Sequence, residues 1–141
     1  YEITINPALA FFMPLIAAMG GNVGVQSSAI VVQGLANKSI DFGNIFTKVS
    51  KEALVGIING IIRGVLIFAF NYFLMDDFKL GLTVSLALLS VIIFAACFGT
   101  LVPLVLDRYK IDPALATGPF ITTMNDVIGL FIYFSISILL Y

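Results

Sequence analysis

Four long apolar stretches dominate the chain, and polar residues separate them at three places. The stretches run approximately over residues 7–35, 53–75, 80–106 and 114–141. Each is long enough to cross about 30 Å of hydrocarbon as an α-helix. Because lipid offers no partners to backbone N–H and C=O groups, helices are the expected form. The pattern predicts an all-α membrane protein, a bundle of four transmembrane helices.

The three polar connections differ in their basic residues, and this difference predicts an orientation. Residues 36–52 carry three lysines, residues 107–113 carry one arginine and one lysine, and residues 76–79 carry only Lys79. Basic residues collect in cytoplasmic connections. Connections 36–52 and 107–113 are therefore predicted to be cytoplasmic. Both ends of the chain, including the C-terminus, are then predicted to lie outside.

The first and fourth stretches resemble each other. Residues 7–24 read PALAFFMPLIAAMGGNVG, and residues 113–129 read PALATGPFITTMNDVIG. An alignment with a one-residue gap places Asp126 opposite Gly21. The two stretches run in opposite directions in the predicted topology, so we predict an inverted repeat, an arrangement in which transporters bind ions near the membrane midplane. Chance similarity between two apolar helices is the alternative.

Each of these stretches also contains an aligned proline. Pro14 and Pro119 have no N–H, so each is expected to free the carbonyl four residues earlier and to kink its helix. A freed carbonyl in lipid is costly unless it faces protein or water. The two prolines therefore favour a polar, water-accessible path over simple packing.

Composition agrees with a membrane protein and narrows the chemistry. Hydrophobic residues make up 60% of the chain and charged residues 11%, against about a quarter charged in soluble domains. The absence of histidine removes the commonest catalytic base and zinc ligand. With no visible nucleophile–base pair or metal cluster, we expect neither an enzyme nor a nucleic-acid partner. The start, YEITINP, does not resemble a signal peptide, and the chain is expected to be a piece of a longer protein.

The first stretch carries small and amide side chains at helical spacing. Gly20, Gly24 and Ser28 form a small-xxx-small row that favours close helix packing. Asn22 and Gln26 are four residues apart and share a helix face. Each amide needs a hydrogen-bond partner within the membrane. Lining an ion path and bonding to a neighbouring helix both remain open.

The second stretch contains a tandem GxxxG row and one charge. Gly56, Gly60 and Gly64 are predicted to form a packing face. Arg63 lies near mid-span, where a fixed positive charge beside a cation path would repel the cation. It is expected to snorkel, or to pair with a carboxylate or exposed carbonyls away from that path.

The fourth stretch is the most polar, with Thr122, Thr123, Asn125 and Asp126 in sequence. An ionised aspartate at a helix centre costs about 2.5–3.5 kcal/mol on insertion scales. Such a residue typically lines a path for an ion, although pairing between Asp126 and Arg63 is an alternative. Helical spacing predicts one polar or small-residue face, made of Gly118, Thr122, Asp126, Gly129 and Tyr133.

Two motifs, GGNVGVQ at residues 20–26 and GPFITTMND at 118–126, together resemble the transmembrane domain of the MgtE family of magnesium channels and transporters. The resemblance covers essentially the whole chain. It implies a homodimer with the pore on its axis, lined by the first and fourth stretches, and an aspartate at position 126 that recognises a hydrated magnesium ion. The family usually has five membrane helices and cytoplasmic regulatory domains, so a helix before Tyr1 and those domains are expected to be missing here.

These observations predict magnesium transport across a lipid bilayer, which the resemblance implies to be a bacterial or archaeal plasma membrane. Mg²⁺ prefers octahedral oxygen ligands and sheds water reluctantly, and Mn²⁺, Co²⁺ or Ca²⁺ are expected to substitute. A proton- or sodium-coupled carrier that uses Asp126, and a non-transporting scaffold, are the alternatives. The predicted metal residues are Asp126 and Thr122, and the predicted pore-lining residues are Gly21, Asn22, Gln26, Gly118, Thr123, Asn125 and Gly129.

Overall fold

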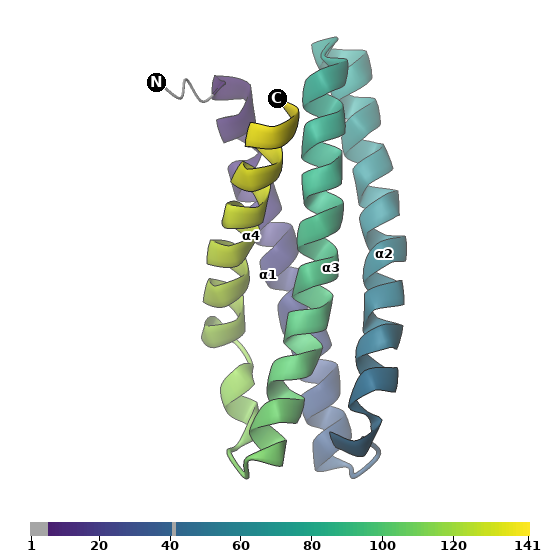
Figure 1. Ribbon diagram of the computed structural model, residues 1–141, viewed down its shortest axis with the longest axis vertical. Helices are drawn as coiled ribbons and strands as arrows, with labels where there is room; N and C mark the ends of the chain where they lie inside the picture. Colours follow the sequence, from purple (N-terminus) through teal and green to yellow (C-terminus); the bar gives the residue numbers. More distant parts are fainter. Residues whose placement is uncertain (1–5, 41) are drawn as a thin grey trace.

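The computed structural model describes residues 6–40 and 42–141. Residues 1–5 and residue 41 lie outside the described residues. The prediction that the chain does not begin with a signal peptide concerns residues 1–5 and so falls mostly outside the described part of the chain. Four long helices form a bundle (Figure 1). They are α1 (Pro7–Ala36), α2 (Ile45–Phe70), α3 (Phe78–Arg108) and α4 (Pro119–Leu140).

Three short helical segments complete the described fold. A 3₁₀ turn, η1 (Phe42–Asn44), precedes α2, and a π-helical turn, η2 (Asn71–Met75), extends it. Another 3₁₀ turn, η3 (Pro113–Ala116), precedes α4. All four spans are long and apolar enough to cross a membrane, and the described residues contain no strand. The prediction of an all-α bundle with four membrane spans is confirmed.

The first and fourth spans run antiparallel, and the start of α1 and the end of α4 lie at the same end of the bundle (Figure 1). The two PALA segments lie toward opposite ends of the bundle, and each begins with a side-chain cap from the residue before its proline. Asn6 Oδ1 accepts a hydrogen bond from Ala8 N at 2.9 Å, and Asp112 Oδ1 accepts one from Ala114 N at 3.0 Å. In both places proline follows the capping residue, where its missing N–H costs nothing.

Helix α3 forms the centre of the bundle. It packs against each of the other three long helices, and its side chains Val84, Leu88, Val91 and Ile92 are fully buried. The outward face of α2, by contrast, is a strip of exposed isoleucine, valine and leucine side chains. In water such a strip would be unfavourable, whereas in a bilayer it contacts lipid tails.

The second span begins earlier than the apolar pattern indicates. Helix α2 starts at Ile45, not at residue 53, and so takes up part of the predicted connection 36–52. The prediction followed hydrophobicity, and this first part of the helix is polar. Lys48 and Glu52, four residues apart, form an ion pair at 3.4 Å within it, a spacing that supports helix formation.

Candidate ion site between the first and fourth spans

The fourth span is interrupted near one end of the bundle rather than kinked. The turn η3 ends at Ala116, and α4 begins at Pro119. Gly118 between them has φ 60° and ψ −130°, a backbone conformation open to glycine but unfavourable for other residues. Pro119 is thus the first residue of α4, where it breaks no helical hydrogen bond. The expectation that Pro119 lies inside the helix is wrong, whereas Pro14 does lie inside α1.

Hydrogen bonds hold the interruption in place. Ser28 Oγ of α1 donates to the carbonyl oxygen of Ala116 at 2.5 Å. The backbone N–H and the side-chain hydroxyl of Thr122 both donate to the carbonyl oxygen of Gly118, at 3.0 Å and 3.1 Å. Thr117 Oγ1 donates to Ala114 O at 2.7 Å. The carbonyls of Ala114, Ala116 and Gly118, at and just before the interruption, are tolerated at membrane depth because protein groups satisfy them.

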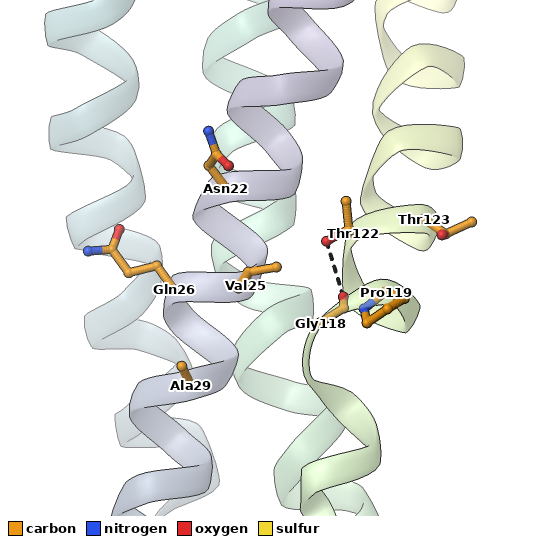
Figure 2. Close-up of a pocket in the computed structure, with 8 residues that line it drawn as sticks. All are labelled: Asn22, Val25, Gln26, Ala29, Gly118, Pro119, Thr122 and Thr123. Atoms are coloured by element: carbon orange, nitrogen blue, oxygen red, sulfur yellow. Dashed lines mark hydrogen bonds between the residues drawn. The ribbon is translucent and has the colours of Figure 1, made fainter.

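A groove of about 710 Å³ lies between α1 and this interruption (Figure 2). It combines side-chain amides, hydroxyls and a backbone turn. Figure 2 shows Asn22 and Gln26 on α1, with Gly118, Thr122 and Thr123 across the groove on the fourth span. Five of the predicted site residues therefore line one groove. Val25, Ala29 and Pro119 line it as well, and no polar side chain marks these three positions in the sequence.

Asp126 lies one helical turn beyond Thr122, at the middle of the fourth span. Its carboxylate packs on Gly21 of α1: a Cβ built on Gly21 would lie 2.9 Å from Asp126 Oδ1 and 3.3 Å from Thr122 Cγ2. The side chain is half-buried, and it makes no hydrogen bond or ion pair with any described residue. Gly21 therefore provides the space that this carboxylate occupies.

The contact between Gly21 and Asp126 joins the two positions that align in the repeat. Gly20 lies beside the next aligned position in the same way, since its added Cβ would be 3.8 Å from Asn125 O. These contacts agree with the alignment of the two stretches, and the inverted repeat stays a prediction.

Asn125 and Gly129 are buried within the bundle and are not among the residues that line the groove. Asn125 is buried, its Nδ2 donates to Ile121 O at 2.9 Å, and its side chain fills the space above Gly24. Gly129 packs against Val91 of α3. Tyr133, which is also buried, donates from its hydroxyl to Leu9 O of α1 at 2.7 Å. These residues hold α4 against α1 and α3, and they do not line the groove.

The second glycine row is a packing face between α2 and α3. Gly56 lies against Ala96 and Ile93, Gly60 against Leu89, and Gly64 against Ser85. Ser85 Oγ donates to Gly64 O at 2.8 Å. The absence of side chains on this face brings α2 close enough to α3 for such contacts.

Arg63 does not pair with Asp126. Within the described residues Arg63 forms neither an ion pair nor a hydrogen bond, and its Nη1 is buried without a partner. The carboxylate of Glu52 instead pairs with Lys48 and accepts from Ser27 Oγ at 3.3 Å. Asp126 is consequently an uncompensated carboxylate at mid-span.

Asp126 and Gly21 are not among the residues that line the groove, but Asp126 lies one helical turn from its lining residue Thr122. The groove and the nearby carboxylate together offer oxygen ligands of the kind that a hydrated divalent cation prefers. One carboxylate with neighbouring amide, hydroxyl and carbonyl oxygens is the set of hard oxygen ligands that Mg²⁺ prefers, and one carboxylate alone cannot replace its water shell. The described residues hold no group of three or more histidine, cysteine, aspartate or glutamate side chains. The site therefore lacks the nitrogen and sulfur ligands that favour zinc or copper.

Comparison with known proteins agrees with this chemistry. The model of the MgtE family, described as divalent cation transporters, matches residues 13–136. The chain belongs to the MgtE family. Among curated relatives, the magnesium transporter MgtE of Bacillus subtilis is 38% identical over 92% of this chain, and that of Enterococcus faecalis is 36% identical over 97%.

A third MgtE relative, the magnesium transporter from Thermus thermophilus, is 35% identical over 94% of this chain. The chain spans 29–31% of the length of these three relatives. Membership in the MgtE family and four apolar spans make this an integral membrane chain of a divalent cation transporter family.

Proposed function

We propose that this chain conducts magnesium ions through a pore on the axis of a homodimer. In this proposal α1 and the interrupted fourth span line the pore, and Asp126 binds a Mg²⁺ ion that keeps its water shell. The observation that carries the proposal is the half-buried Asp126 carboxylate, which has no partner among the described residues. An unpaired ionisable side chain at the centre of a membrane span is a default candidate for an ion site.

The groove supplies the other oxygens. Asn22, Gln26, Thr122 and Thr123 line it together with the turn at Gly118 (Figure 2). Water molecules bound to the ion can also form hydrogen bonds with these polar groups, so the ion need not lose its hydration shell. Mn²⁺, Co²⁺ and Ca²⁺ accept oxygen ligands and are proposed to enter the same site.

A second copy of the chain completes the pathway. One carboxylate per chain is a weak site for a divalent cation, and a two-fold axis beside α4 would present two copies of Asp126 to one ion. The exposed face of α4 beside Asp126 is apolar and large, with Val127 62% and Phe131 73% exposed. A second α4 is a suitable partner for this face.

The relatives named as magnesium transporters are bacterial, which supports a bacterial plasma membrane as the location. In the proposed orientation, the connections between α1 and α2 and between α3 and η3 are cytoplasmic. Lys38, Lys48, Lys51, Arg108 and Lys110 all belong to that end of the bundle, and Lys79 to the other.

Asp126→Asn tests the proposal. The amide keeps the size of the side chain but removes two charges from a dimeric site. At partly screened distances each charge–ion attraction is on the order of a few kcal/mol, so affinity is expected to fall about tenfold or more. Magnesium flux into liposomes and thermal stability in detergent are measured together.

The two readouts separate an ion site from a structural role. Flux is expected to fall while stability holds, because the substitution removes a costly charge from the membrane. Asp76→Asn, at an exposed carboxylate in the turn between η2 and α3, is the matched control and should change neither. Normal magnesium flux from a stable Asp126→Asn protein would reject the proposal.

A further inference from the structure

A second polar cavity, of about 360 Å³, lies between α1 and α2, with Ala96 of α3 among its lining residues. Five of its lining side chains are polar: Gln26 and Ser27 on α1, and Glu52, Asn59 and Arg63 on α2. Gln26 belongs to both cavities, so the second cavity adjoins the ion groove through this residue. Nothing in the proposed cation pathway accounts for a positive charge here.

The Arg63 guanidinium faces this cavity without a partner. It makes no hydrogen bond or ion pair with a described residue, and its Nη1 is buried. The guanidinium group stays protonated in proteins. Met75, the end of the span, is twelve residues further along, which corresponds to about 18 Å of helix. Arg63 is therefore too deep to reach the membrane surface at that end by extending its side chain.

The carboxylate in the cavity does not neutralise Arg63. Glu52 precedes Arg63 by eleven residues, or about 16 Å along the helix. It is already paired with Lys48 at 3.4 Å and accepts a hydrogen bond from Ser27. Side chains on a helix lean toward its N-terminus, so Arg63 points into the cavity while Glu52 points away from Arg63. The cavity thus keeps an excess positive charge at its deep end.

We propose that this cavity is water-filled and binds a small inorganic anion such as chloride against Arg63. The Gln26 side chain makes no hydrogen bond with the described residues, so its amide N–H groups are available to the same anion. A water molecule occupies about 30 Å³ in the liquid, so the cavity has room for one anion and several waters. Arg63 lies at mid-span, below the depth of lipid headgroups, which favours a diffusible anion over a lipid phosphate.

Charge-selective labelling of a cysteine tests the site without any transport assay. The full chain carries Cys97→Ala and Asn59→Cys and is reconstituted into phosphatidylcholine vesicles made permeable to both reagents. The reagents are an anionic sulfonatoethyl and a cationic trimethylammonioethyl methanethiosulfonate. For each reagent the labelling rate is divided by its rate with free cysteine. The divided rate of the anionic reagent is expected to be about tenfold higher than that of the cationic reagent, because a charged cleft concentrates ions of opposite sign.

Chloride then serves as the ligand probe. Replacing gluconate by chloride at constant ionic strength should slow the anionic reagent severalfold. Arg63→Gln should remove both the charge preference and the protection by chloride, and Arg63→Lys should keep part of both. Ile58→Cys, on the exposed lipid-facing side of α2, is the control and should show neither effect.

Several results would overturn the anion site. An unreactive Asn59→Cys would mean that the cavity is dry. Equal relative rates for the two reagents, or a preference that survives in a folded Arg63→Gln protein, would mean that Arg63 does not attract anions. Labelling that ignores chloride would mean that no chloride binds. If Arg63→Gln fails to fold, the chloride dependence of the Arg63-containing protein and of Arg63→Lys decides the question.

Discussion

Asn125 and Asp126 are neighbours in the chain, yet α4 places them in different environments. Asn125 is buried over Gly24 and hydrogen-bonds to its own helix, and its Oδ1 has no partner. Asp126 turns toward Gly21 and remains half-buried. The two glycines of α1 make room for different side chains. Gly21 leaves space for the Asp126 carboxylate, and Gly24 leaves space for the Asn125 amide, which packs between α1 and α4.

At Gly118 the backbone conformation, and not the surrounding space, restricts which residue can be present. A Cβ there would meet nothing within 4 Å, but φ is 60°, so Gly118→Ala introduces strain without a collision. We expect the free energy of unfolding to fall by about 1–3 kcal/mol. Thermal unfolding in detergent measures this, with Gly64→Ala as the control, since Gly64 has ordinary helical geometry. An unchanged melting temperature for Gly118→Ala would show that the turn is not fixed by this residue.

Sequence reasoning predicted Asp126 from its depth in the apolar run, and the repeat alignment placed it opposite Gly21, but the alignment alone could not show that the two residues touch. That contact depends on how two helices cross. The interruption before α4 did have a local signal, the Gly118–Pro119 pair, because this dipeptide marks turns. The long apolar run concealed it. Ser28 was assigned to packing, whereas its hydroxyl donates to Ala116 O across the α1–η3 contact.

At the scale of elements, the glycine row of α1 contacts both α3 and α4, whereas the glycine row of α2 contacts α3. Gly20 and Gly24 of α1 lie beside Val91 and Asn125, and Gly56, Gly60 and Gly64 of α2 lie along α3. Membrane helices gain stability from such close approach, because lipid tails give no hydrophobic drive for association. The helices themselves were predictable from their apolar length. Their contacts were not, because every face of such a helix is apolar.

Gly24 is tightly packed and Gly64 is not, so alanine substitutions at these two positions form a matched pair. A Cβ on Gly24 would overlap the Asn125 amide and lie 3.1 Å from Ile121 Cγ2, whereas one on Gly64 would have its nearest neighbour at 3.5 Å. Overpacking typically costs about 1–3 kcal/mol. Gly24→Ala should therefore lower the melting temperature, and Gly64→Ala should leave it unchanged or raise it. Equal effects of the two substitutions would contradict the packing described for Gly24.

At the scale of the whole molecule, the start of α1, the end of α4 and the η2–α3 turn occupy one end of the bundle, and the other two connections occupy the opposite end (Figure 1). With Cys97 replaced by alanine, an impermeant thiol reagent added to intact cells should label a cysteine at Asp76. A cysteine at Lys51 should react only after permeabilisation. Both positions are exposed. The reverse result would invert the orientation and leave the antiparallel relation of the first and fourth spans intact.

Assembly is also a property of the whole molecule. Cysteines placed singly at Val127 or Phe131 of α4, again without Cys97, are expected to crosslink two identical chains under mild oxidation, because a two-fold axis brings equivalent residues together. Ile62→Cys, on the exposed face of α2, should not crosslink. A chain that conducts magnesium while remaining strictly monomeric would exclude the dimeric pore.

The position of the ion tests the central claim most directly. Crystals soaked in Mn²⁺, which accepts the same oxygen ligands as Mg²⁺, can be measured at the manganese absorption edge. We predict one anomalous peak on a two-fold axis between two copies of Asp126, at a distance that leaves room for bound water, and no such peak in Asp126→Asn crystals. A peak elsewhere in the membrane region with none near Asp126, or one that persists unchanged in Asp126→Asn, would contradict the assignment of Asp126 as the ion site.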